Sequence, residues 1–154
     1  MRLVVAVVGK TRNPALGEAI RDYETRAARY WPLDVHEVRE ERATGMSIEK
    51  VKEREGARLS ERVPERAQTV ACEIGGRALD SSQFADFLMS AREEDRDLAF
   101  LIGGAYGLAA DVSGRSAMKL SLAPWTLPHE IARLVLVEQI YRAGTIVRGE
   151  PYHK

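Results

Sequence analysis

Cysteine and aromatic residues are scarce in this 154-residue chain, and neither sign of charge is in excess. The one cysteine, Cys72, cannot by itself form an internal disulfide or a cysteine-based metal site. We therefore expect a buried, inert thiol in a reducing compartment, and no metal. The 23 Lys and Arg residues balance 23 Asp and Glu residues, so net charge predicts no nucleic-acid partner. Any RNA-binding surface would have to be a local basic patch.

Long apolar runs are also absent. No run approaches the roughly 20 residues that a membrane helix needs, and the amino-terminal segment turns polar at Lys10 without a small-residue cleavage site. We expect a cytoplasmic protein with no membrane segment. A chain of 154 residues, 45% of them hydrophobic, is long enough for one domain with its own core.

The apolar residues that are present form short runs separated by helical segments. This alternation predicts an α/β domain with a mainly parallel sheet flanked by helices. The expected strands cover residues 3–8, 33–38, 69–74, 98–102 and 119–123, and Gly75 and Gly76 should end the third. The expected helices cover residues 14–30 after an Asn13 cap, 47–62, a segment capped by Ser81 or Ser82, 109–115, and a segment from about Pro128.

The last predicted helix is apolar around most of its circumference. At 100° per residue, Ile131, Leu134 and Val135 share a stripe with Glu138 and Arg142. Such a helix is buried, either in its own domain or against a second copy of the chain. An ion pair in a buried stripe must be satisfied or it is costly, so Glu138 and Arg142 indicate an interface or a site.

Three segments should reach the carboxyl edge of the sheet, where ligands of α/β proteins bind. They are "CEIGG", "LIGGAYG" and "LAPWTLPH". The spacing of Gly103, Gly104 and Gly107 matches neither a dinucleotide loop nor a P-loop, and a tight turn would also explain these glycines. Together the segments could form a pocket whose main-chain groups recognise an adenine edge.

Two further features have both a structural and a functional interpretation. His129 follows the third segment and could be a capping residue or a neighbour of the pocket. The terminal "RGEPYHK" could be a disordered tail, or it could hold phosphate and stack a base.

The segments "RLVVAVVGK", "LIGGAYGL", "TLPHEIARLVLVEQIYRA" and "PYHK" resemble the RlmH-type family of SPOUT-superfamily methyltransferases, from the first strand to the last residue. The resemblance implies S-adenosylmethionine-dependent methylation of N3 of a pseudouridine in 23S ribosomal RNA, on the assembled ribosome. It also implies a SPOUT fold with a C-terminal trefoil knot, and a homodimer in which the tail of one subunit could complete the site of the other.

The resemblance also implies site residues. The cofactor contacts would be Cys72, Gly103, Leu122, Ala123, Pro124, Trp125, Thr126 and Leu127. This chain departs from the commoner Gly-Gly-Pro-Glu-Gly loop at Ala105 and Tyr106, so no catalytic carboxylate is assigned there.

For the chemistry, Arg142 is the candidate to stabilise the N3 anion or bind phosphate, with Glu138 orienting it. Tyr152 and His153 are candidates for base contact or proton handling, and His129 is a weaker one. A basic strip is predicted around Lys10, Arg12, Arg133, Arg142, Arg148 and Lys154.

Two competing functions remain open from the sequence. A non-catalytic ribosome- or RNA-binding module would bind in a salt-sensitive way without stabilisation by S-adenosylmethionine. A nucleotide-dependent oxidoreductase would be stabilised by NAD instead.

Overall fold

The computed structural model describes residues 1–153, with His153 described in its backbone only. One five-stranded sheet has the order β2-β1-β4-β3-β5, and every pair of neighbouring strands is parallel. The prediction of an α/β fold with a parallel sheet is therefore confirmed. The strands are β1 (Leu3–Val8), β2 (Leu33–Val38), β3 (Gln68–Ala78), β4 (Leu98–Ile102) and β5 (Met118–Ser121).

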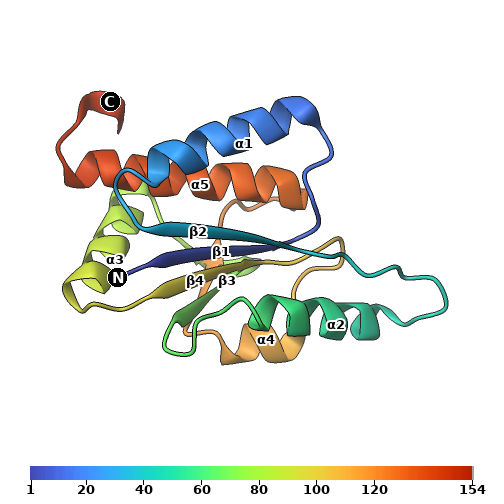
Figure 1. Ribbon diagram of the computed structural model, residues 1–154. Coiled ribbons are helices and arrows are strands. Elements are labelled where there is room, and N and C mark those ends of the chain that lie inside the picture. Colours follow the sequence, from blue (N-terminus) through green and yellow to red (C-terminus); the bar gives the residue numbers. More distant parts are fainter. Residues whose placement is uncertain (154) are drawn as a thin grey trace.

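Helices cover both faces of this sheet (Figure 1). They are α1 (Pro14–Ala27), α2 (Ile48–Ser60), α3 (Ser81–Glu93), α4 (Ala110–Arg115) and α5 (His129–Val147), followed by a short 3-10 helix, η1 (Pro151–His153). Alternate residues of a strand point to opposite faces. Accordingly, Leu3 and Val5 of β1 pack in the core beneath α1, α3 and α5, whereas Ala6 and Val8 pack towards α2 and α4.

The centre of the sheet is β4, and all of its residues are buried. The unbroken apolar run of its sequence follows from this position, because a central strand with helices on both faces has no solvated side. Its carboxyl end leads into the loop that contains Gly103, Gly104 and Gly107.

The third strand was predicted to end at Gly75, but β3 continues to Ala78. Its pairing with β5 shifts register between Cys72 and Arg77. A Cβ on Gly76 would lie 2.7 Å from the backbone nitrogen of Leu120, so the glycine allows the two strands to approach closely. The glycines mark an irregularity inside the strand instead of its end.

The helix boundaries differ from expectation in two places. Helix α1 begins as predicted, with the Asn13 side chain accepting hydrogen bonds from the first turn, but it ends at Ala27 and not near Tyr30. Just beyond its end, the fully buried Trp31 donates a hydrogen bond from Nε1 to the carbonyl of Ile140 at 2.9 Å. Helix α3 is capped by Asp80, in a capping box with Gln83, and not by Ser81 or Ser82.

Helix α5 packs along α1 and α3 (Figure 1). Its buried side includes Leu136, Val137 and Ile140. The predicted stripe of Ile131, Leu134, Val135, Glu138 and Arg142 lies on another side and stays partly exposed. The stripe is therefore not covered by the chain's own fold. Within residues 1–153, no helix has the length and apolar character that a membrane span requires.

Candidate functional site

A cavity of about 730 Å³ opens at the carboxyl edge of the sheet. Its walls come from the three segments predicted to meet there: β3 near Cys72, the loop after β4, and the loop after β5. Seven of the eight predicted cofactor contacts line it, namely Cys72, Gly103, Leu122, Ala123, Trp125, Thr126 and Leu127. Pro124 belongs to the same loop but does not line the cavity.

One charged lining residue comes from outside the three predicted segments. Lys52 reaches the cavity from α2, whereas Glu73 and Ile74 belong to the predicted segment "CEIGG". Charges of both signs alternate along α2, a pattern typical of a solvated helix face, so nothing local in the sequence marks Lys52.

The loop after β4 is folded tightly on itself. The amide of Gly107 donates to the carbonyl of Gly104 at 3.0 Å, and Gly107 adopts a positive φ of +82°. A Cβ on Gly103 would lie 2.5 Å from the carbonyl carbon of Gly107. Residue 103 must therefore lack a side chain because the backbone of Gly107 lies against it within the same loop.

A buried carboxyl group supports this loop from the other side. Glu55 of α2 is 4% exposed, and its Oε1 accepts the backbone N–H of Glu41 at 2.9 Å. Its Oε2 has no hydrogen-bond partner among the described residues, and a Cβ on Gly104 would lie 2.8 Å from that oxygen. Burial raises the pKa of Glu55, although the hydrogen bond from Glu41 acts in the opposite direction.

Two side chains of the cavity wall, Cys72 and Glu73, are not poised for catalysis. Burial, with a smaller contribution from Glu73, raises the pKa of the Cys72 thiol to about 12, so the thiol stays protonated at neutral pH. Glu73 is satisfied by the hydroxyl of Ser113 at 2.8 Å and the ammonium of Lys119 at 3.4 Å. Neither group offers a nucleophile or a free base.

His129 begins α5 and lines the cavity. Its Nε2 is buried and has no hydrogen-bond partner within residues 1–153. A Cβ on Gly9, where φ is +90°, would lie 2.8 Å from this nitrogen. The turn after β1 therefore leaves room for the imidazole, and His129 is a wall residue of the cavity more than a helix cap.

The residues predicted to perform chemistry form a separate cluster on α5 and the tail. Arg142 pairs with Glu138 at 2.5 Å, and its guanidinium lies 4.8 Å from the centroid of the Tyr152 ring. The Tyr152 hydroxyl donates to Glu138 Oε1 at 3.1 Å and lies 3.1 Å from the hydroxyl of Tyr23. The side chain of His153 lies outside the described part of the chain.

Ionisation in this cluster favours fixed charges over proton transfer. The hydrogen bond that Arg142 donates to Glu138 is the main cause that raises the pKa of Arg142, so the guanidinium stays charged. Burial and the contacts with Tyr23 and Glu138 raise the pKa of Tyr152. Its phenol therefore remains protonated at neutral pH and can donate a hydrogen bond, but it is a poor base.

Within one chain, the structure does not bring this cluster to the cavity. His129 lies at the cavity end of α5, and Arg142 lies about 20 Å further along the helix at 1.5 Å per residue. The tail turns back over the far end of α5 (Figure 1). The cavity and the Arg142 cluster are therefore distinct in a single copy.

The predicted basic strip is wrong for Arg133. This side chain is buried and forms ion pairs with Glu24 at 2.7 Å and Glu37 at 2.6 Å, which join α5 to α1 and β2. Arg12 pairs with Glu40, and Arg148 stacks over Tyr30 at 4.5 Å. Lys154 lies outside the described residues. Among the described members of the predicted strip, Arg12, Arg133 and Arg142 each form an ion pair with a carboxylate.

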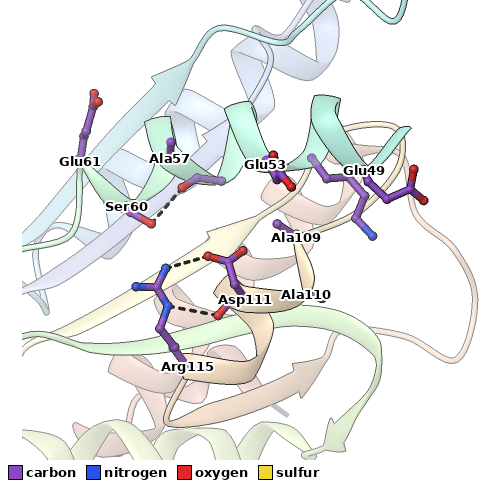
Figure 2. Close-up of a pocket in the computed structure, with 11 residues that line it drawn as sticks. Glu49, Glu53, Ala57, Ser60, Glu61, Ala109, Ala110, Asp111 and Arg115 are labelled. Carbon is purple, nitrogen blue, oxygen red and sulfur yellow. Dashed lines mark hydrogen bonds and ion pairs between the residues drawn. The ribbon is translucent and has the colours of Figure 1, made fainter. Parts of the chain in front are cut away.

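A second hollow, of about 850 Å³, lies between α2 and α4 (Figure 2). Its rim carries charges of both signs, including Glu49, Glu53 and the Asp111–Arg115 ion pair, and none of the predicted site residues lines it. Across residues 1–153, no three His, Cys, Asp or Glu side chains converge in a way that could hold a metal ion.

Comparison with known proteins identifies the family to which the chain belongs. Residues 1–153 match a family described as "Predicted SPOUT methyltransferase". The chain is 57% identical, over the full length of both proteins, to "Ribosomal RNA large subunit methyltransferase H" of Gemmatimonas aurantiaca. Proteins of the same name from Syntrophotalea carbinolica and Geotalea daltonii are 39% and 38% identical over 99% of each chain. The chain therefore belongs to the SPOUT methyltransferase family.

Proposed function

We propose that this protein uses S-adenosylmethionine to methylate N3 of a pseudouridine in 23S ribosomal RNA, acting as a cytoplasmic homodimer on the assembled ribosome. The observation that carries the proposal is the convergence of three separate segments on one cavity at the carboxyl edge of the sheet. Membership of the SPOUT family and full-length relatives named as ribosomal RNA methyltransferases support it.

The cavity suits an adenosine-containing cofactor. Its volume of about 730 Å³ lies within the range of about 300–1,000 Å³ usual for small-molecule sites. The wall combines apolar side chains such as Ile102 and Leu122 with the backbone of glycine-rich and proline-rich loops. The apolar side chains of such a wall can pack against the faces of an adenine ring, and its main-chain N–H and C=O groups can form hydrogen bonds with the edge of that ring.

When bound, S-adenosylmethionine supplies an electrophilic methyl group. The protein's task is then to hold the pseudouridine N3 in line with that group, because positioning removes much of the entropic barrier. The proton on N3 must also leave, and a nearby cation favours the anion that remains. Among the predicted residues, Arg142 has the permanent charge for this role, with Glu138 fixing its orientation.

A second copy of the chain would bring the Arg142 cluster to the cavity. The partly exposed face of α5 carries Ile131, Leu134 and Val135, which a dimer interface would cover. A two-fold axis that passes through this face at right angles to α5 would set the two α5 helices antiparallel, because the 180° rotation reverses the helix direction. The Arg142 end of one helix would then lie near the His129 end of the other.

The roles of the tail follow from this arrangement. Tyr152 would donate a hydrogen bond or stack on the RNA, and would not act as the base, because its pKa is raised. His153 remains the candidate for proton handling, and His129 for a contact at the cavity wall. The trefoil knot implied by the family resemblance remains a prediction for the segment that includes the loop after β5 and α5.

A melting series with separate ligands tests the assignment of the cavity. S-adenosylmethionine at 100 times its dissociation constant should stabilise the protein by about 2.7 kcal/mol, whereas NAD should have no effect. Stabilisation by NAD alone would indicate an oxidoreductase. Salt-sensitive ribosome binding with no response to either ligand would indicate a binding module without activity.

A further inference from the structure

The cavity mouth carries an unusual group of exposed apolar side chains. Across residues 1–153, four large hydrophobic side chains are exposed: Ile48, Ile74, Tyr106 and Trp125. Three of them, Ile74, Tyr106 and Trp125, line the cavity at the carboxyl edge of the sheet, and we call these three the exposed rim. Single exposed apolar residues need no explanation, but a group around one cavity marks a binding surface.

The exposed rim differs from the deeper wall of the same cavity. Ile102, Leu108 and Ala132 of the wall are at most 8% exposed, whereas Trp125 is 76% exposed. The indole of Trp125 is therefore mostly solvent-exposed and contributes little to the packing of the fold. The rim residues also come from three segments, β3 and the loops after β4 and β5, so the grouping is produced by the tertiary fold.

We propose that the rings of Trp125 and Tyr106 stack on the RNA base presented to the cavity. The inference rests on the proposed function, because a base must enter over this mouth to reach a methyl donor held deeper inside. Every base has a π-face, and proteins that hold unpaired bases use aromatic side chains as stacking platforms. The main chain of the Trp125 loop would still contribute to cofactor binding.

A free cation accompanies the aromatic rings. Lys52 lies between this cavity and the hollow beside α4, lining both, and forms no ion pair within residues 1–153. Glu73, which also lines the cavity, is neutralised by Lys119. A cation beside stacking rings is the combination that holds the phosphate and base of a single-stranded nucleotide. An interface with a second copy would be expected to exclude an unpaired lysine from its centre, and the aliphatic face of α5 offers a more suitable surface for that contact.

The kinetics of Trp125→Ala on ribosomes lacking the modification test this assignment. The variant should raise KM for ribosomes, or lower kcat/KM, by about 5- to 150-fold, which is the range for losing one stacked base. Trp125→Phe should restore most of the activity because it keeps a ring. Ile48→Ala is the matched control, since Ile48 is exposed but lies outside the cavity.

Two further measurements on the same variants separate the alternatives. The dissociation constant for S-adenosylmethionine and the sedimentation mass should stay unchanged in Trp125→Ala. If the variant loses cofactor affinity in proportion to its activity, the inference is wrong and the exposed rim binds the cofactor. If its sedimentation mass changes, the inference is also wrong and the exposed rim contacts a second copy. If the parent protein is active and Trp125→Ala has unchanged kinetics, the stacking inference is wrong and the proposed function stands. If the parent protein itself is inactive, the proposed function is wrong as well.

The tryptophans provide an independent readout. Trp31 is fully buried, so acrylamide quenching of the parent protein reports on Trp125. An oligouridylate should protect this signal from acrylamide, whereas S-adenosylmethionine alone should not. Protection by the cofactor and not by the oligouridylate would contradict a stacking role.

Discussion

Gly103 and Gly107 are in backbone contact, so closely that a Cβ on Gly103 would lie 2.5 Å from the carbonyl carbon of Gly107. This contact folds the loop that forms one wall of the cavity. It explains the glycine at position 103 by the packing of the loop, without any appeal to a phosphate. The shape of the cavity consequently depends on a position where no side chain fits.

Gly103→Ala should displace this loop and weaken binding of S-adenosylmethionine by at least about tenfold, with a loss of stability of about 1–3 kcal/mol from overpacking. Calorimetric titration and thermal unfolding measure the two effects. Gly114→Ala is the control, because a Cβ there meets no atom within 4 Å. Equal cofactor affinity in the two variants would show that the loop does not shape the site.

Glu55→Gln should stabilise the protein at high pH. Because burial raises the pKa of Glu55 in the folded state, its contribution to stability is present below the unfolded pKa and is lost as pH rises through the folded pKa. The amide oxygen can still accept the Glu41 N–H, so the variant should gain about 1 kcal/mol at pH 8 and little at pH 4. Urea unfolding across this range measures the difference, with the exposed Glu53→Gln as control; a difference independent of pH would be inconsistent with a buried, unpaired carboxylate.

Arg133→Met should lower the free energy of unfolding by about 3–5 kcal/mol, because it leaves the carboxylates of Glu24 and Glu37 without their buried partner. Arg115→Met removes an exposed ion pair with Asp111 and should cost at most about 1 kcal/mol. Chemical denaturation compares the two variants. Similar losses would mean that the Arg133 pairs contribute no more than a surface pair.

Mixing two impaired variants, assayed at a cofactor concentration that saturates the parent protein but not Gly103→Ala, tests whether the site is shared between subunits. If Arg142 of one copy acts at the cavity of the other, heterodimers of Gly103→Ala and Arg142→Ala contain one intact site. A mixture refolded together should then recover about a quarter of the parent activity, as expected for random pairing in a two-fold dimer. Each variant refolded alone is the control. No recovery from a verified heterodimer would place Arg142 and the cavity of the same chain in one site.

Much of the fold could be predicted because the relevant patterns are local. The buried run at Leu98–Ile102 and the Asn13 cap each depend on neighbouring residues, and both were found where expected. Three loops could be assigned to one edge because parallel strands end on the same side. The extension of β3 past Gly75 could not be predicted from the sequence, because it depends on how closely Gly76 approaches Leu120 of another strand.

The parts of the site that escaped prediction depend on contacts between distant segments. Arg133 meets Glu24 and Glu37, which are 109 and 96 residues away in sequence, so a residue expected in a basic strip is buried. Lys52 belongs to a helix of alternating charge, and only the packing of α2 against the sheet places it beside the glycine loop. The packing of the tail away from the cavity also depends on a distant contact, because the Tyr152 hydroxyl meets that of Tyr23 on α1.

The most direct measurement of the proposed reaction uses ribosomes that lack the modification, incubated with S-adenosylmethionine carrying an isotope-labelled methyl group. The ribosomal RNA is then digested to nucleosides and analysed by mass spectrometry, with free 23S RNA as a parallel substrate. Labelled N3-methylpseudouridine from the ribosome sample is the predicted result. Absence of labelled methylpseudouridine from both substrates, with cofactor binding intact, would contradict the proposed function.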